Sequence, residues 1–160
     1  MAYVLRNPKK ILVAIDGSKC SMRAAAYAIS IALKNNSQLI VLHVLFSQLK
    51  YAYSHHLLGF VTPSEMKNEI EATRMKANQW FKILENKINK IDPSMKNYLI
   101  TDFLVTDMSV PHAIVNYAED HDIDLIVVGS RGKSGLKRMV LGSVTSSVVN
   151  YSSCPVLIIK

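Results

Sequence analysis

The run Leu125-Ile126-Val127-Val128 constrains the fold of this chain more tightly than any other stretch of its sequence. It is short, rich in β-branched residues and closed by Gly129, which is typical of a strand buried on both faces of a parallel sheet. Similar runs with helical patterns between them lie at Lys10–Asp16, Gln38–Leu45, Tyr98–Val105 and Pro155–Ile159. The alternation predicts an α/β fold with a mostly parallel, open, five-stranded sheet and helices on both faces.

The stretch that follows this run has the features of an anion site. Gly132 and Gly135 follow Gly129 at intervals of three, and Gly142-Ser143 opens another helical segment. Glycines allow close approach of the backbone, and free N–H groups at a helix start favour a bound phosphate. The charged residues between the two ends are all basic: Arg131, Lys133, Lys137 and Arg138. We therefore expect a phosphate-binding loop.

Two named nucleotide motifs do not fit this loop. A Walker A loop would need its first glycine where Val127 stands, and the dinucleotide fingerprint G-x-G-x-x-G differs from the observed G-x-x-G-x-x-G. The remaining pattern is Gly129-x2-Gly132-x9-Gly142-Ser143. It resembles the ATP-binding loop of the universal stress protein family.

Three further segments carry the same resemblance in the same order. Ile11–Ser18 resembles the first strand of the family, Leu39–Val44 the second, and Pro155–Ile159 the last. The resemblance covers nearly the whole chain and is weakest over Lys50–Pro63. It implies a Rossmann-like sheet of strand order 3-2-1-4-5, in which strands one and four are adjacent at the topological switch point, where such folds bind ligands.

The resemblance also implies the site residues. Asp16 is expected beside the ribose or the phosphates, although it also fits a purely turn-shaping role, and Val44 is expected against the adenine ring. Backbone N–H groups in the glycine loop, that of Gly142 included, are expected to hold the phosphates, with Mg²⁺ bound to the phosphates and no protein metal site. The expected nucleotide-binding residues are Ala14, Ile15, Asp16, Val44, Val128, Gly129, Arg131, Gly132, Gly142, Ser143, Val144 and Thr145.

Three functions are compatible with these residues. The first is a regulatory, ATP-binding protein of the stress response. It would hydrolyse ATP slowly or not at all and would have no catalytic residue. The second is a nucleotide-hydrolysing or nucleotidyl-transferring enzyme, which is disfavoured because Asp16 is the only acidic residue expected in the crevice. The third is a dimeric interaction module without nucleotide, which the intact glycine pattern disfavours. The resemblance further implies a homodimer formed through antiparallel pairing of the last strand.

Composition restricts the remaining possibilities. At 160 residues we expect one domain, 1–160. The formal charge of +7 is compatible with nucleic-acid binding. However, the sequence has no basic run of five residues and no RNA-binding aromatic or zinc-finger segment. No apolar run approaches the roughly 18 residues of a membrane span, and the N-terminus lacks a signal-peptide layout. We expect a cytoplasmic protein that contacts neither membrane nor nucleic acid.

Several local features are also predicted. Ser18 is expected to cap a helix whose buried stripe contains Cys20, Ala24, Tyr27, Ala28 and Ile31. The longest helix is expected over Ser64–Ile91 with Ser64 as its cap, and residues 46–63 before it as a flexible surface loop rather than a lid. His43 is expected to be a satisfied core histidine.

Overall fold

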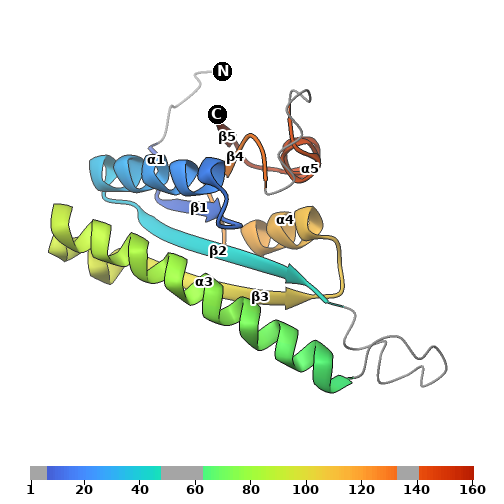
Figure 1. The fold of residues 1–160 in the computed structure, drawn as a ribbon. Coiled ribbons are helices and arrows are strands. Elements are labelled where there is room, and N and C mark those ends of the chain that lie inside the picture. The colour runs from blue at the N-terminus through green and yellow to red at the C-terminus, as the bar shows by residue number, and fades with distance from the viewer. Residues whose placement is uncertain (1–6, 48–62, 133–140) are drawn as a thin grey trace.

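The computed structural model describes residues 7–47, 63–132 and 141–160 of the chain (Figure 1). Most of the loop expected over residues 46–63 therefore lies outside the described residues, as do Lys133, Gly135, Lys137 and Arg138 of the glycine stretch. Of the expected loop, Phe46 instead ends a strand, and residue 63 begins a helix.

The described residues form one five-stranded sheet with helices between its strands (Figure 1). The elements are β1 (Lys10–Ala14), α1 (Lys19–Asn35), β2 (Gln38–Phe46), α3 (Pro63–Ile91), η1 (Pro93–Tyr98), β3 (Leu99–Thr106), α4 (Val110–Asp120), β4 (Leu125–Gly129), α5 (Ser143–Tyr151) and β5 (Val156–Ile159). The strand order is β3-β2-β1-β4-β5 and every neighbouring pair is parallel. The predicted α/β class and strand order are confirmed.

Two apolar layers enclose the sheet. One layer packs α1 and α3 against alternate residues of the central strands, with Ile11, Val13 and Val127 fully buried. The other packs α4 and α5 against the opposite face, where Leu12 and Ile126 are fully buried. Strands buried on both faces explain the continuous apolar runs in the sequence.

Helix α1 begins as predicted and buries part of the predicted stripe. Ser18 is its N-cap, and the Ser18 hydroxyl accepts a hydrogen bond from the Ser21 N–H at 3.2 Å. The buried apolar residues are Ala24, Ala25, Ala28, Ile29 and Ala32. Ala24 and Ala28 of the predicted stripe are fully buried, whereas Tyr27 is 54% exposed and Cys20 is only half-buried. The prediction was therefore right for the two alanines and wrong for Tyr27. Small alanines let α1 approach the sheet closely.

Helix α3 begins at Pro63, one residue earlier than predicted, so Ser64 lies in its first turn and is not its cap. Its buried residues are Ala77, Phe81, Leu84 and Ile88, which recur at helical spacing, whereas Ile91 at its end is exposed. Figure 1 shows α3 running beside β2 and β3. Among the described residues, no helix is both long enough and apolar enough to cross a membrane.

Candidate functional site

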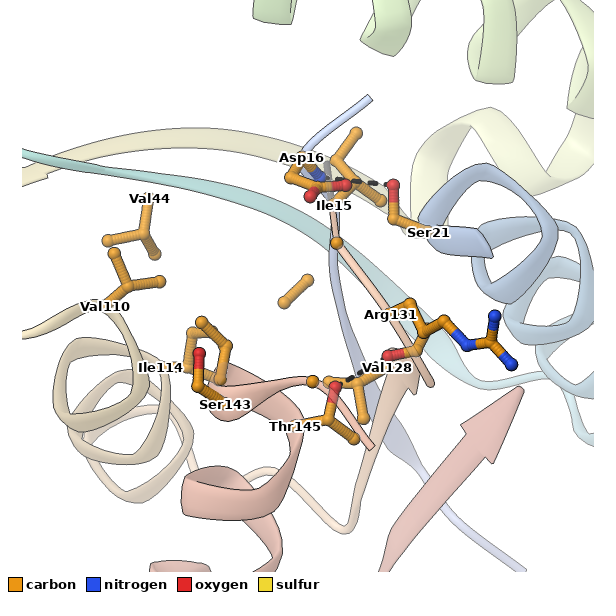
Figure 2. A pocket seen from close by; sticks show the side chains of 15 residues that line it. Ile15, Asp16, Ser21, Val44, Val110, Ile114, Val128, Arg131, Ser143 and Thr145 are labelled. Atoms are coloured by element: carbon orange, nitrogen blue, oxygen red, sulfur yellow. Dashed lines mark hydrogen bonds between the residues drawn. The ribbon is translucent and has the colours of Figure 1, made fainter. Parts of the chain in front are cut away.

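A pocket of about 230 Å³ lies at the carboxyl ends of β1, β2 and β4, where the first turns of α4 and α5 meet the sheet (Figure 2). Strands β1 and β4 are adjacent here although they are far apart in the sequence. The lining residues are Ala14, Ile15, Asp16, Ser21, Val44, Val110, Ile114, Val128, Gly129, Arg131, Gly132, Gly142, Ser143, Val144 and Thr145. All twelve residues selected from the sequence are in this set, and Ser21, Val110 and Ile114 are additional.

One end of the pocket is apolar. Figure 2 shows Val44 of β2 close to Val110 of α4, with Ile114 one turn further along the same helix. Val128 of β4 is buried and also contributes to the lining. Side chains of this kind suit a flat, apolar ring.

The other end of the pocket is the start of α5. Gly142 is the N-cap and offers no side chain to the helix. The Ser146 N–H donates to the Gly142 carbonyl at 2.9 Å, which is the first turn-closing bond of the helix. The N–H groups of Ser143, Val144 and Thr145 therefore have no acceptor within α5 and, with the helix dipole, favour an anion.

The N–H of Gly142 itself is already used. It donates to the Ser130 carbonyl at 2.9 Å, so the expectation that this group holds a phosphate is wrong for this structure. The Thr145 hydroxyl donates to the Gly129 carbonyl at 2.7 Å. These two bonds fasten the start of α5 to the end of β4, which sets the direction of the three remaining N–H groups.

The three described glycines of the motif differ in how much space a side chain would have. A Cβ at Gly129 would lie 2.8 Å from the backbone of Cys20 and Ser21, so this glycine lets α1 pack against the end of β4. A Cβ at Gly132 would lie 2.9 Å from Asp16 Oδ2. At Gly142 the nearest atoms would be 3.5 Å away, which is ordinary contact.

Asp16 shapes the turn after β1 and also faces the pocket. Its Oδ1 accepts a hydrogen bond from the Ser18 N–H at 2.9 Å, and its own N–H donates to the Ser21 hydroxyl at 3.2 Å. Its Oδ2 lies on the side of Gly132. The turn-shaping role is thus present, and one carboxylate oxygen is still directed toward the glycine loop.

Two charged features define what the site offers electrostatically. Asp16 is the only acidic side chain among the described lining residues. Arg131 is exposed, and in Figure 2 its guanidinium points away from Val44 and Ile114. The described residues contain no group of three or more histidine, cysteine or acidic side chains placed to hold a metal ion.

Comparison with known proteins identifies the family. The model of the universal stress protein family matches residues 7–160. The chain belongs to the universal stress protein family. A relative from Bacillus subtilis, Universal stress protein YxiE, is 38% identical over 152 residues, which covers 94% of this chain and 98% of the relative.

Solved universal stress proteins have the same fold. Universal stress protein UspA from Lactobacillus plantarum is 26% identical, with a TM-score of 0.79, over 95% of this chain and 97% of that chain. A crystal structure of a universal stress protein in complex with cAMP is also 26% identical, with a TM-score of 0.62, over 97% of this chain and 99% of that chain. The family resemblance inferred from the glycine pattern is therefore confirmed.

The three lining residues missed in the sequence are explained by their position in this universal stress protein fold. Val110 and Ile114 are four residues apart at the start of α4, a spacing that places both on one helix face. That helix begins just beyond the end of β3, at the edge of the sheet where the pocket opens. Ser21 is 4% exposed and bonds the Asp16 N–H. The helical spacing was the available signal for the α4 pair, whereas nothing in the sequence distinguishes Ser21 from other serines.

Proposed function

We propose that this universal stress protein binds ATP in the pocket and acts as a regulatory protein of the stress response. The observation that carries the proposal is the joining, in one pocket, of an apolar end and a helix start with three N–H groups that lack an acceptor within the helix. An adenine nucleotide has the matching parts, a flat base at one end and phosphates at the other. The cAMP complex of a related protein supports this class of ligand.

Each part of ATP has a fitting set of residues. The base fits between Val44 and the apolar face of α4 formed by Val110 and Ile114. The ribose fits beside Oδ2 of Asp16, on the side of Gly132, because a carboxylate accepts hydrogen bonds from hydroxyl groups but repels phosphates. The phosphates fit at the amides of Ser143 and its neighbours. Mg²⁺ would be held by the phosphates, since Asp16 alone is too few ligands for a protein cage.

The proposal includes slow hydrolysis or none. Efficient phosphoryl transfer needs a residue that orients water and strong stabilisation of the leaving group. Asp16 is the only acidic residue of the described lining, and one of its oxygens is already bonded to the Ser18 N–H. We therefore expect nucleotide to stay bound through many minutes of incubation without multiple turnovers.

The test is to denature freshly purified protein and to analyse the released small molecules by chromatography. We expect adenine nucleotide at close to one per chain, or saturable binding when ATP is added to protein stripped of ligand. Release of ATP rather than ADP would support the role of a regulatory ATP-binding protein. Repeated turnover of added ATP would instead favour a nucleotide-hydrolysing enzyme. A protein that carries no nucleotide and ignores added ATP would overturn the proposal.

The same proposal includes a homodimer formed along β5. Pro155 and Ile159 use their carbonyl groups to accept bonds from the Ile126 and Ser130 N–H groups of β4, at 3.0 and 2.7 Å. Because backbone groups alternate along a strand, the N–H groups of Val156 and Ile158 face away from β4. Within the described part of the chain, β5 has no strand on its outer side. Pairing with a second copy would satisfy these outward-facing groups.

A further inference from the structure

The turn that carries Asp16 is contacted from a helix that does not line the pocket. Gly17 follows Asp16 and has a φ of 80°, in the left-handed region that favours glycine. A Cβ built on Gly17 would lie 2.1 Å from Cζ2 of the Trp80 indole on α3. The indole therefore rests directly against the backbone of this turn and leaves no space for a side chain at Gly17.

Trp80 is itself held in place by a cluster of rings. The His43 ring lies edge-on to it, with ring centroids 5.3 Å apart and an interplanar angle of 85°. His43 also packs against Phe103 of β3, with ring centroids 5.6 Å apart. The Arg74 guanidinium in turn lies 4.5 Å from the centre of the Phe103 ring. The cluster joins α3, β2 and β3 behind the turn.

His43 connects this cluster to the pocket by a second route. It is 6% exposed, and its Nδ1 is 2.7 Å from the Ile15 carbonyl. The Ile15 N–H in turn donates to the Leu42 carbonyl at 2.9 Å. The residue before Asp16 is thus held by β2, while the residue after it is held by α3.

The position of the turn matters because its carboxylate lies close to the glycine loop. Asp16 Oδ2 lies 2.9 Å from the place where a Cβ on Gly132 would stand, so a shift of the turn alters the distance between the carboxylate and the glycine loop. A side chain that contacts the turn but does not line the pocket can therefore act on the site through this one carboxylate.

We infer that Trp80 is a positioning residue for Asp16, so that its contact with the turn sets the affinity of the nucleotide site. This inference rests on the proposed nucleotide site and adds the residue that regulates it. Trp80 is not among the residues that line the pocket, and its effect passes through Gly17 to the carboxylate. A ligand or modification that displaces Trp80 from the turn changes nucleotide affinity, and nucleotide binding must in turn favour the position of Trp80 against the turn.

A double-mutant cycle tests whether the effect passes through Asp16. ATP with magnesium chloride is titrated by calorimetry into ligand-free wild type, Trp80→Leu, Asp16→Asn and the double variant. We expect Trp80→Leu to weaken ATP binding about tenfold, near the lower end of what a lost hydrogen bond to a charged group costs. In the Asp16→Asn background the same change should weaken binding less than about twofold, because residues that act through one another are not additive.

Phe81→Leu is the matched control for general damage to α3. Phe81 is 5% exposed, packs in the same core layer and does not line the pocket. It should leave ATP affinity within about twofold of wild type, because the atoms nearest to Gly17 come from Trp80 and not from Phe81. If Trp80→Leu does not fold, Trp80→Phe replaces it in the cycle, with a smaller effect in the same direction.

Fluorescence gives a readout that does not require substitution of Trp80. Trp80 is the only tryptophan in the sequence, so all tryptophan emission comes from this residue and its surroundings. We expect saturating ATP to shift or quench the emission, and to do so less in Asp16→Asn at equal saturation. Equal losses of affinity in both backgrounds of the cycle, or no loss at all, would overturn the inference and leave the proposed function standing. A wild type that binds no ATP would overturn both.

Discussion

Gly129 and Gly142 belong to one sequence pattern, yet their surroundings give them different roles. Gly129 is required by the fold, because α1 begins against it and leaves no room for a Cβ. Gly142 has ordinary space around it and a φ of −68°, which any residue adopts. Its position nevertheless lies 3.7 Å from the Gly132 amide, measured from where a Cβ would stand. The fold therefore requires glycine at position 129 but not at position 142.

Alanine substitution at each position should show this difference in the free energy of unfolding. Gly129→Ala should lower the free energy of unfolding by about 1–3 kcal/mol, because the new methyl group meets backbone that cannot move aside cheaply. Gly142→Ala should change it by less than about 0.5 kcal/mol, as is usual at sites without special constraints. Urea denaturation followed by circular dichroism measures both, and equal losses would contradict this assignment of roles.

At the scale of elements, α4 is docked on the edge of the sheet by a polar contact within an apolar layer. The Tyr117 hydroxyl donates to Asp102 Oδ2 of β3 at 3.0 Å, and the tyrosine ring stacks on His121 with centroids 3.9 Å apart. Burial, followed by the hydrogen bond and the negative charge of Asp102, raises the pKa of Tyr117 well above its ordinary value of 10.0. The start of this same helix supplies Val110 and Ile114 to the pocket.

This contact predicts a pH dependence of stability. With a raised folded-state pKa, the contribution of Tyr117 is fully present below pH 10.0 and is lost as the pH rises above it, because the unfolded chain ionises first. The free energy of unfolding should therefore fall more steeply above pH 10 in wild type than in Tyr117→Phe. Chemical denaturation at several alkaline pH values measures the slopes.

Tyr27→Phe is the control for this prediction, because Tyr27 is 54% exposed and should leave the slope unchanged. At neutral pH, Tyr117→Phe should cost about 1 kcal/mol, the usual net value of one hydrogen bond. Identical alkaline slopes for wild type and Tyr117→Phe would show that the contact does not hold the tyrosine proton.

For the whole molecule, the two edges of the sheet differ in what lies next to them. At the β3 edge, α3 packs alongside and Arg74 covers the Phe103 ring. At the β5 edge the residues from Val156 to Ile158 are only half-buried, and two N–H groups point outward. An apolar edge of this kind favours pairing with another strand, and in the proposed dimer a second copy of the chain would provide that strand.

Proline at Val156 should weaken the proposed dimer. Val156→Pro removes one outward N–H but keeps the bonds to β4, which involve the neighbouring residues, and proline is tolerated at the first position of a strand. Val156→Ala is the matched control, since it shortens the same side chain and keeps the N–H. Sedimentation velocity over a range of concentrations should show a dimer for wild type and Val156→Ala and a larger monomer fraction for Val156→Pro. Equal monomer fractions in all three proteins would exclude pairing through this group.

The sequence by itself determined the fold class, the order of elements and the place of the site. The apolar runs identify strands buried on both faces, and the twelve residues implied by the family resemblance all line one pocket. The strands are predictable because they depend on local periodicity, and the pocket residues because the resemblance rests on short motifs in the sequence. His43 was expected to be a satisfied core histidine, as a lone histidine in a strand usually is, and this is confirmed.

Only the tertiary structure decided how these residues are used. The buried face of α1 consists of alanines and Ile29, whereas Tyr27 of the predicted stripe is exposed. The Gly142 N–H donates to the Ser130 carbonyl although Gly142 belongs to the motif. Trp80 rests on the turn of Asp16, a contact that the sequence did not indicate. Each of these facts depends on contacts between distant segments, and such contacts leave no periodic signal in the chain.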